Sequence, residues 1–145
     1  MITAKDNAHI KHIRKLMGRS KARREEGLFI LEGYKPVAEA LRRGLVRELV
    51  LSGALKTAEA SVLKKVDDLR RQAQEQFVPV TDIARTLFDS LSDTVTPQGI
   101  LAIVQMPEYN RTEILEKENC KLLCLEDVRD PGNIGTMIRD RKSVV

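Results

Sequence analysis

The sequence predicts an α/β fold, in which a small layered α/β domain spans residues 1–106 and a second α/β unit occupies residues 120–145. Three observations lead to this prediction. Short apolar runs alternate with segments whose apolar residues recur at helical spacing, which is typical of layered α/β domains. The apolar pattern lapses after residue 106, which predicts a linker over residues 107–119. A new apolar run at residues 121–125 then leads into a Pro-Gly turn.

The chain begins with a predicted amphipathic helix. Asp6 or Asn7 can cap it, since short polar side chains accept hydrogen bonds from the free N–H groups of a first helical turn. Its apolar face holds Ile10, Ile13, Leu16 and Met17. A basic, turn-prone stretch follows over residues 18–27.

Strands and helices then alternate. The predicted strands are residues 28–31, 46–51, 77–80 and 100–104. The last of these is apolar throughout, which predicts a central position in the sheet. The predicted helices run from near Pro36 to Gly44, over residues 57–76, and from a cap at Thr81 or Asp82 to Leu91. The three phenylalanines lie in these apolar patterns and are predicted to be core residues: Phe29, Phe77 and Phe88.

Positive charge is concentrated at the start of the chain. The formal net charge is +4, and only Asp6 opposes the basic residues that precede Glu25. A solvated basic face is the ordinary explanation of such a tract, and phosphate binding is the functional one. The basic residues of interest are Lys11, Arg14, Lys15, Arg19, Lys21, Arg23 and Arg24.

Other features narrow the class of protein. No apolar stretch approaches the roughly 20 residues of a membrane span, and the first residues are polar, so a cytoplasmic protein without membrane contact is expected. Cys120 and Cys124 lie too close in one apolar run for a good disulfide, and no further ligands sit nearby. They are predicted to be reduced core thiols, and no metal is expected.

The loop after residues 121–125 has the geometry of a ligand loop, which in α/β folds lies beyond the carboxyl ends of the strands. Pro131 fixes one turn dihedral, Gly132 tolerates positive φ, and Asn133 can cap the helix that follows. Gly135 lets a substrate approach the backbone. The Gly-Lys-Ser/Thr and G-x-G-x-x-G phosphate motifs are missing. A simple strand-to-helix turn remains an alternative for this loop.

Residues 122–139, LLCLEDVRDPGNIGTMIR, resemble the first signature motif of the SpoU-type (TrmH-like) RNA ribose 2′-O-methyltransferases. Three upstream landmarks resemble the accessory substrate-binding domain of that family and occur in its order and spacing. They are Ile10-Lys11 with the basic tract, LFILEG at residues 28–33, and TPQGILAIV at residues 96–104. The resemblance covers all but the last six residues.

The resemblance implies a small α/β RNA-binding domain over residues 1–106, followed by the first strand, loop and helix of a knotted α/β methyltransferase domain. It also implies S-adenosylmethionine as cofactor, ribosomal or transfer RNA as substrate, and a homodimer as the assembly. Asn133 and Arg139 match the family's active-site Asn and Arg. Asn133 would hold the loop or bind the substrate. A guanidinium keeps its proton in nearly all proteins. Arg139 is therefore expected to orient an RNA phosphate and stabilise charge on the nucleophile, rather than act as a base.

The chain also departs from the family pattern. Residues 140–145 look unrelated to it, and the second and third motifs are absent. We expect a truncated catalytic domain, and a polypeptide that by itself neither binds S-adenosylmethionine nor methylates RNA. We also expect residues after about 107 to be loosely ordered, because the apolar run at residues 121–125 lacks sheet partners.

The mode of RNA recognition follows from the aromatic content. The chain has no Trp, two Tyr and three Phe, so phosphate and shape recognition are expected more than base stacking. Tyr34, just after Gly33, is the best aromatic candidate for a surface contact. Two alternatives remain open: a stand-alone RNA-binding module without catalysis, and a small metabolite-binding α/β domain.

Overall fold

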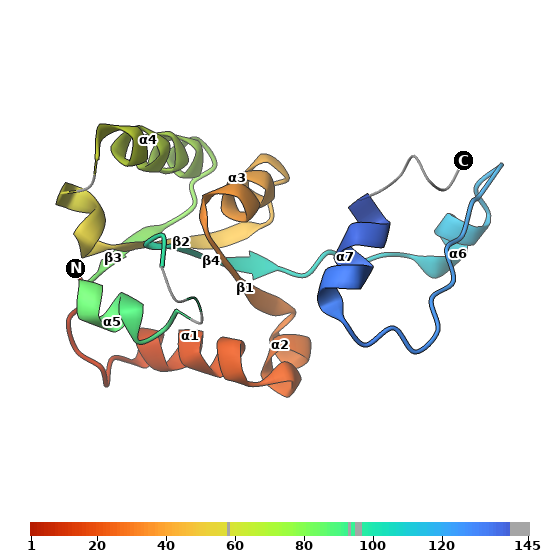
Figure 1. Cartoon of the computed structure of the whole chain (residues 1–145), viewed down its shortest axis with the longest axis horizontal. Coiled ribbons are helices and arrows are strands. Elements are labelled where there is room, and N and C mark those ends of the chain that lie inside the picture. The colour runs from red at the N-terminus through yellow and green to blue at the C-terminus, as the bar shows by residue number, and fades with distance from the viewer. Residues whose placement is uncertain (58, 93, 95–96, 140–145) are drawn as a thin grey trace. The chain divides into compact units, whose positions relative to one another are not determined.

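The computed structural model describes residues 1–57, 59–92, 94 and 97–139. The chain divides into two compact units, Met1–Pro107 and Glu108–Val145, which are treated separately. Unit 1 holds a four-stranded mixed sheet between two layers of helices (Figure 1). The strands are β1 (Leu28–Glu32), β2 (Val46–Ser52), β3 (Val80–Ile83) and β4 (Ile100–Gln105).

The strand order is β1-β4-β2-β3. Strand β4 is antiparallel to β1 and to β2, whereas β2 and β3 are parallel. The predicted α/β class and the predicted central position of residues 100–104 are therefore confirmed.

The side chains of β4 point alternately into two cores. Ile100, Ala102 and Val104 pack with α3 (Tyr34–Arg42) and α4 (Ala60–Glu75). Leu101 and Ile103 pack on the other face with α1 (Ala8–Gly18) and α5 (Arg85–Asp89). Successive side chains of a strand point to opposite faces. A strand covered on both faces must therefore be apolar throughout.

Helix α1 forms where the sequence predicts a helix. The Oδ1 atom of Asn7 accepts a hydrogen bond from the backbone N–H of His9 at 2.9 Å. Ile10, Ile13 and Leu16 are fully buried against the sheet. The predicted cap and the predicted apolar face are both confirmed.

A second helix, α2 (Ser20–Glu26), occupies the stretch predicted to be turn-prone. That part of the prediction is wrong, because α2 has a single buried side chain, Ala22, and so lacks apolar periodicity. Gly27 ends the helix with a φ of 64°. The Nη1 atom of Arg23 donates to the carbonyls of Leu16 and Met17, both at 2.8 Å, and so ties α2 to the last turn of α1.

The strand predicted over residues 77–80 is displaced to β3, and Phe77 is 95% exposed rather than in the core. The chain leaves α4 through a Schellman turn, in which the N–H of Phe77 donates to Gln74 O and that of Val78 to Ala73 O. Phe77 takes the left-handed φ of 56° that this turn requires. Glycine usually occupies this position, so a phenylalanine there gave no sequence signal for the turn.

The displacement also changes the start of the next helix. Thr81 and Asp82 lie in β3 instead of capping a helix, and α5 begins after Ala84. Leu87 and Phe88 are buried as predicted. Before α4, a short 3-10 helix (Gly53–Thr57) follows β2, so α4 begins three residues later than predicted.

Among residues 108–139, unit 2 has two helices, α6 (Arg111–Leu115) and α7 (Pro131–Arg139). The strand predicted at residues 121–125 is absent from this described part. Leu122 and Leu123 are 61% and 52% exposed. Cys120 and Cys124 are free thiols but are exposed, so their predicted core location is wrong. The apolar run finds no core among these residues.

Hydrogen exchange is expected to report this difference. Amides of residues 122–125 should exchange several orders of magnitude faster than those of β4. Strand β4 is buried and has a strand on each side, whereas residues 122–125 are exposed and outside any strand. Exchange followed by mass spectrometry measures both segments in one sample. Equal protection of the two would contradict the expectation.

Candidate nucleic-acid interface

The basic tract maps onto α1, α2 and the residue between them. We call Lys11, Arg14, Lys15, Arg19, Lys21, Arg23 and Arg24 the α1–α2 basic surface. All are exposed except Arg14 and Arg23, which are half-buried. Helices α1 and α2 lie on the same side of the sheet (Figure 1), so they carry these cations on that side.

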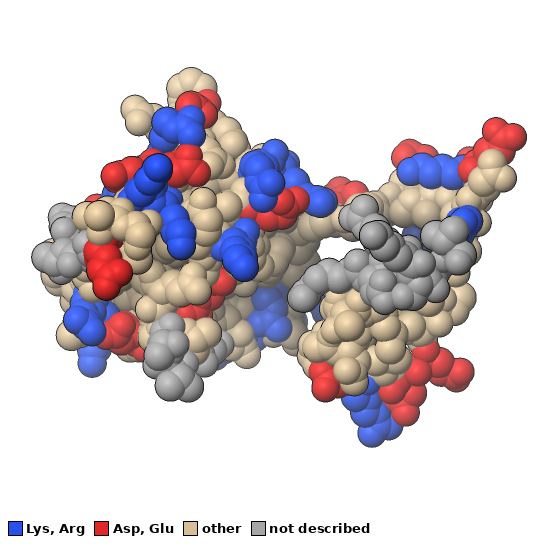
Figure 2. Space-filling model, turned by 45° about the horizontal axis from the view of Figure 1, so that its top comes forward, with Lys and Arg blue, Asp and Glu red and all other residues tan. Residues whose placement is uncertain are grey.

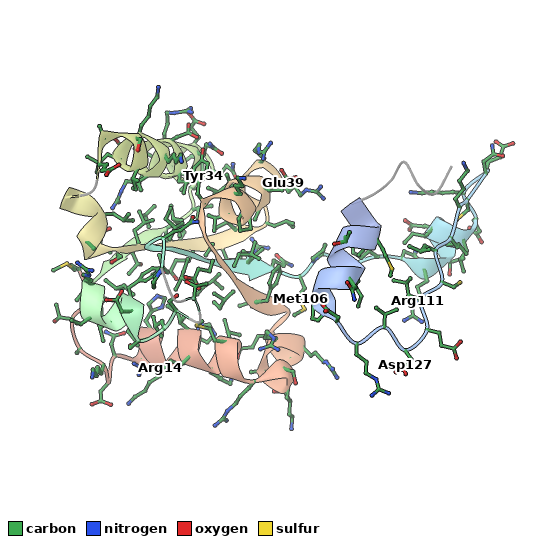
Figure 3. The ribbon with its side chains drawn as sticks, viewed as in Figure 1. Arg14, Tyr34, Glu39, Met106, Arg111 and Asp127 are labelled. Carbon is green, nitrogen blue, oxygen red and sulfur yellow. The ribbon has the colours of Figure 1, made fainter. Side chains whose placement is uncertain are left out.

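Two of these arginines are held by the fold. Arg14, labelled on α1 in Figure 3, donates to Ser90 Oγ at 3.1 Å and to the carbonyl of Lys5 at 3.4 Å. Arg23 binds the carbonyls at the end of α1. Both therefore have a structural role, and contact with RNA stays a prediction for them.

Glu26 is the main internal counter-ion of the surface. Its carboxylate lies 2.8 Å from Lys15 Nζ and 2.6 Å from His12 Nε2. Lys15 and then His12 lower the pKa of Glu26 below its usual value. Lys11 pairs more loosely with Asp6 at 3.3 Å, and Lys21 with Glu25 at 3.8 Å.

Arg19 and Arg24 are different. Both side chains are exposed, and neither makes an ion pair or hydrogen bond within the described part of the chain. Exposed ion pairs are worth only about 0–1 kcal/mol, so the paired lysines can also exchange a carboxylate for a phosphate. The α1–α2 basic surface thus offers cations to several phosphates, and Arg19 and Arg24 can bind one without giving up a side-chain partner in the described part of the chain.

The face formed by α3 and α4 has a different charge pattern. Figure 2 shows Lys and Arg intermixed with Asp and Glu there. Glu39 pairs with Arg42 and Arg43 at 2.7 and 2.8 Å, and Arg43, followed by Arg42, lowers its pKa. Arg71 pairs with Asp68 and Glu75. Many cations of this face are therefore neutralised locally.

A second candidate region lies where the chain leaves the sheet. Strands β1, β2 and β3 share one direction, and β4 runs against it. Their carboxyl ends therefore lie at the edge where β4 begins, which is the usual ligand-binding edge of open α/β sheets. We call it the carboxyl edge.

Two of the sequence landmarks meet at the carboxyl edge. The N–H of Gly33 donates to Ile100 O at 2.9 Å, and the N–H of Tyr34 donates to Gln98 Oε1 at 3.0 Å. Glu32 accepts from the hydroxyls of Ser92 and Thr94 at 2.5 and 2.7 Å. Hydrogen bonds thus join the C-terminal end of LFILEG to Gln98 and Ile100 of TPQGILAIV.

Two cavities flank Gln98. One, of about 340 Å³, is lined by Tyr34, Val62, Lys65, Pro97, Gln98 and Ile100. The other, of about 240 Å³, is lined by Pro97 and Gln98 together with Ser52, Ala54, Leu55, Arg85, Asp89 and Gly99. The sequence singled out Tyr34 but not Lys65 or Gln98, because these lie on distant segments that only folding brings together.

In unit 2, helix α7 begins at Pro131, within the predicted ligand loop. Asp130 Oδ1 accepts from the N–H groups of Gly132 and Asn133 at 2.6 and 3.3 Å. Asp130 is therefore the cap, and the predicted capping role of Asn133 is wrong, because proline at the first helical position places Asn133 inside the first turn. Asn133 is exposed, and Arg139 is the last residue of α7. The side chain of Arg139 lies outside the described part.

This loop also tests the fit of S-adenosylmethionine. The backbone N–H groups of Gly132 and Asn133 already donate to Asp130. Pro131, Gly132 and Asn133 are all exposed. The described residues of unit 2 therefore do not enclose a cofactor by themselves. Among all the residues that the structure describes, no helix is long and apolar enough to cross a membrane.

Comparison with known proteins identifies the domain. The model of the MRM3-like substrate binding domain matches residues 7–102. The chain belongs to this family. The resemblance predicted from the sequence is thereby confirmed for the substrate-binding domain, whose match covers both the α1–α2 basic surface and the carboxyl edge.

Relatives of this MRM3-like chain are RNA methyltransferases by name. The 23S rRNA (guanosine(2553)-2′-O)-methyltransferase RlmP of Bacillus subtilis (strain 168) is 32% identical over 140 residues, which cover 95% of this chain and 48% of that protein. The mitochondrial rRNA methyltransferase 3A of Danio rerio is 33% identical over 129 residues, 85% of this chain and 27% of that protein. The chain thus spans less than half of these curated relatives.

A solved structure shares the fold. The AdoMet-bound rRNA methyltransferase from Sinorhizobium meliloti matches with a TM-score of 0.59 and 22% identity. The match covers 74% of this chain and 37% of that one. At this identity the likeness supports the mixed α/β fold of the MRM3-like chain.

Proposed function

We propose that this chain is the substrate-binding part, with the beginning of the catalytic part, of an RNA ribose 2′-O-methyltransferase that acts on ribosomal RNA. Residues 1–106 bind the RNA, residues 107–119 form the linker, and residues 120–145 begin the catalytic domain. One observation carries the proposal: the family match spans the unit that presents the α1–α2 basic surface. A cytoplasmic location and a homodimer belong to the same proposal.

The α1–α2 basic surface is the proposed phosphate contact. Phosphate binding releases condensed counter-ions, so such affinity falls steeply as salt rises. A metabolite-binding domain would show no salt-dependent affinity for RNA. The salt slope therefore distinguishes the two functions.

Asn133 and Arg139 are the proposed catalytic residues. In the proposed transfer the ribose 2′-oxygen would bond to the methyl carbon as the sulfonium S–CH3 bond breaks and leaves a thioether. The hydroxyl proton would pass to solvent, so the attacking oxygen carries developing negative charge. Arg139 would orient a phosphate of the RNA and stabilise that charge, and Asn133 would hold the loop or bind the substrate. S-adenosylmethionine is the proposed donor, and its pocket requires residues beyond those described in unit 2. That this chain alone does not bind it stays a prediction.

Charge reversal tests the phosphate contact. The double variant Arg19→Glu/Arg24→Glu should bind a structured rRNA fragment about tenfold more weakly, uniformly across sequences. Its log–log salt slope should fall by about 1.5, because two phosphate contacts each contribute about 0.7–0.9. Filter binding at two salt concentrations measures both quantities.

A matched control separates local contact from total charge. Lys117→Glu/Lys121→Glu changes the net charge by the same amount, from +4 to 0, at exposed positions of unit 2. This control should change affinity and slope far less. Equal effects of the two double variants, or RNA binding that is insensitive to salt, would refute the proposed surface.

A further inference from the structure

We propose that the cavity between the start of α3 and α4 binds one unpaired RNA base, which stacks on Tyr34. The inference rests on the proposed RNA-binding function and adds a substrate class to it: RNA with an exposed nucleotide, rather than a regular duplex. Tyr34 is labelled in Figure 3, at the first position of α3.

The cavity has the size and lining of a site for a small planar group. Its volume of about 340 Å³ lies within the range of about 300–1,000 Å³ that is usual for ligand sites. Its walls combine the ring of Tyr34 with the apolar side chains of Val62 and Ile100. An unpaired base offers a flat face to such a ring, and this stacking tolerates any base.

Lys65 supplies a positive charge over the face of that ring. Its Nζ atom lies 5.7 Å from the centroid of the Tyr34 ring. No carboxylate pairs with Lys65 within the described residues, whereas Arg42, Arg43 and Arg71 on the same helices are paired. A base that stacks on Tyr34 would displace Lys65 from the ring face and bring its own backbone phosphate, and Lys65 is a cation of the cavity wall that can then bind this phosphate.

Gln98 supplies directional hydrogen bonding. A backbone N–H can bond only to the oxygen of a side-chain amide, so the bond from Tyr34 fixes Oε1 and leaves Nε2 as the other terminal atom. Nε2 carries two N–H donors, which have no partner within the described residues. Carbonyl oxygens and ring nitrogens on a base edge are their natural acceptors.

The site is preformed by Gly33. This residue has a φ of 95°, and a Cβ atom there would lie 3.3 Å from Gln98 Oε1. Glycine thus lets the Gln98 amide lie against the backbone where α3 starts. Because Gln98 and Tyr34 are held before RNA arrives, binding costs little ordering of these side chains.

The test compares two RNAs with equal numbers of phosphates. One is a hairpin with 2-aminopurine in its unpaired loop, and the other is a duplex with the same probe paired. The wild-type chain should bind the hairpin about tenfold more tightly and quench its probe, because only there can a base enter the cavity. Tyr34→Ala should lose that tenfold on the hairpin and leave duplex affinity unchanged.

Two further variants guard against misfolding. Tyr34→Phe keeps the ring and should retain hairpin affinity within about twofold. Gln98→Glu keeps an acceptor for the Tyr34 N–H, removes both donors and adds a negative charge, so it should weaken hairpin binding more than duplex binding. Salt-dependent binding of both RNAs without preference, or equal losses on both in Tyr34→Ala, would overturn the base site and leave the proposed function standing. No binding to either RNA would overturn both.

Discussion

Gly99→Ala is expected to lower the free energy of unfolding of unit 1 by about 3 kcal/mol. Gly99 has a φ of 75°, and a left-handed backbone costs an L-residue about 1–2 kcal/mol. A Cβ atom there would also lie 3.0 Å from Leu55 Cγ and 3.2 Å from Ser52 Cβ. Ser52 cannot retreat easily, since its N–H donates to Gly99 O at 2.9 Å. Overpacking of this kind adds about 1–3 kcal/mol.

Gly27→Ala is the matched control for this prediction. Gly27 has a similar φ of 64°, but no atom lies within 4 Å of its would-be Cβ. Gly27→Ala should therefore lower the free energy of unfolding only by the cost of the left-handed backbone, about 1–2 kcal/mol. Urea unfolding followed by far-ultraviolet circular dichroism suits a chain without tryptophan. Equal losses in the two variants would show that packing at the carboxyl edge is not the cause.

Arg139→Ala is expected to lower the rate of methyl transfer by about 10²–10³-fold in a chain that carries the complete catalytic domain. The reason is the loss of a fixed positive charge near the oxygen that attacks the methyl group. Single-turnover transfer of labelled methyl groups to an rRNA fragment measures the rate. The affinity for that RNA should fall far less than the rate, because Arg139 is proposed to contact one phosphate and the other phosphate contacts are proposed for unit 1.

Arg139→Lys separates the two possible roles of the arginine. Lysine keeps the charge but loses the planar fork, so the rate should recover in part and its pH profile should keep the wild-type form. A profile that shifts with the lower pKa of a lysine would indicate proton abstraction by this residue. A rate unaffected by Arg139→Ala would remove Arg139 from the active site.

Much of the fold was predictable from local patterns. The cap of α1 was predictable because asparagine is a common capping residue, and its buried face was predictable from helical spacing. The central place of β4 was predictable from an apolar run without alternation. The failures are also local in origin. Helix α2 has no apolar period, and Phe77 fills a turn position that glycine normally marks.

The candidate sites were also predictable only in part. The basic tract was visible as a list of residues, but the structure decides which of them stay available. Arg23 is held by the end of α1, Lys15 is paired with Glu26, and Arg19 and Arg24 remain open to solvent within the described chain. The Tyr34 cavity was not predictable, since Gln98 lies 64 residues away along the chain.

The sequence alone determined the α/β class, the order of most elements, the basic start of the chain and the family. Those properties depend on residue spacing and short motifs, which can be recognised in the sequence without knowledge of contacts between distant segments. Tertiary structure alone decided the direction of β4 against its neighbours and the meeting of Gln98, Tyr34 and Lys65. These depend on contacts between distant segments, whose energies come from packing and hydrogen bonds that no local pattern encodes.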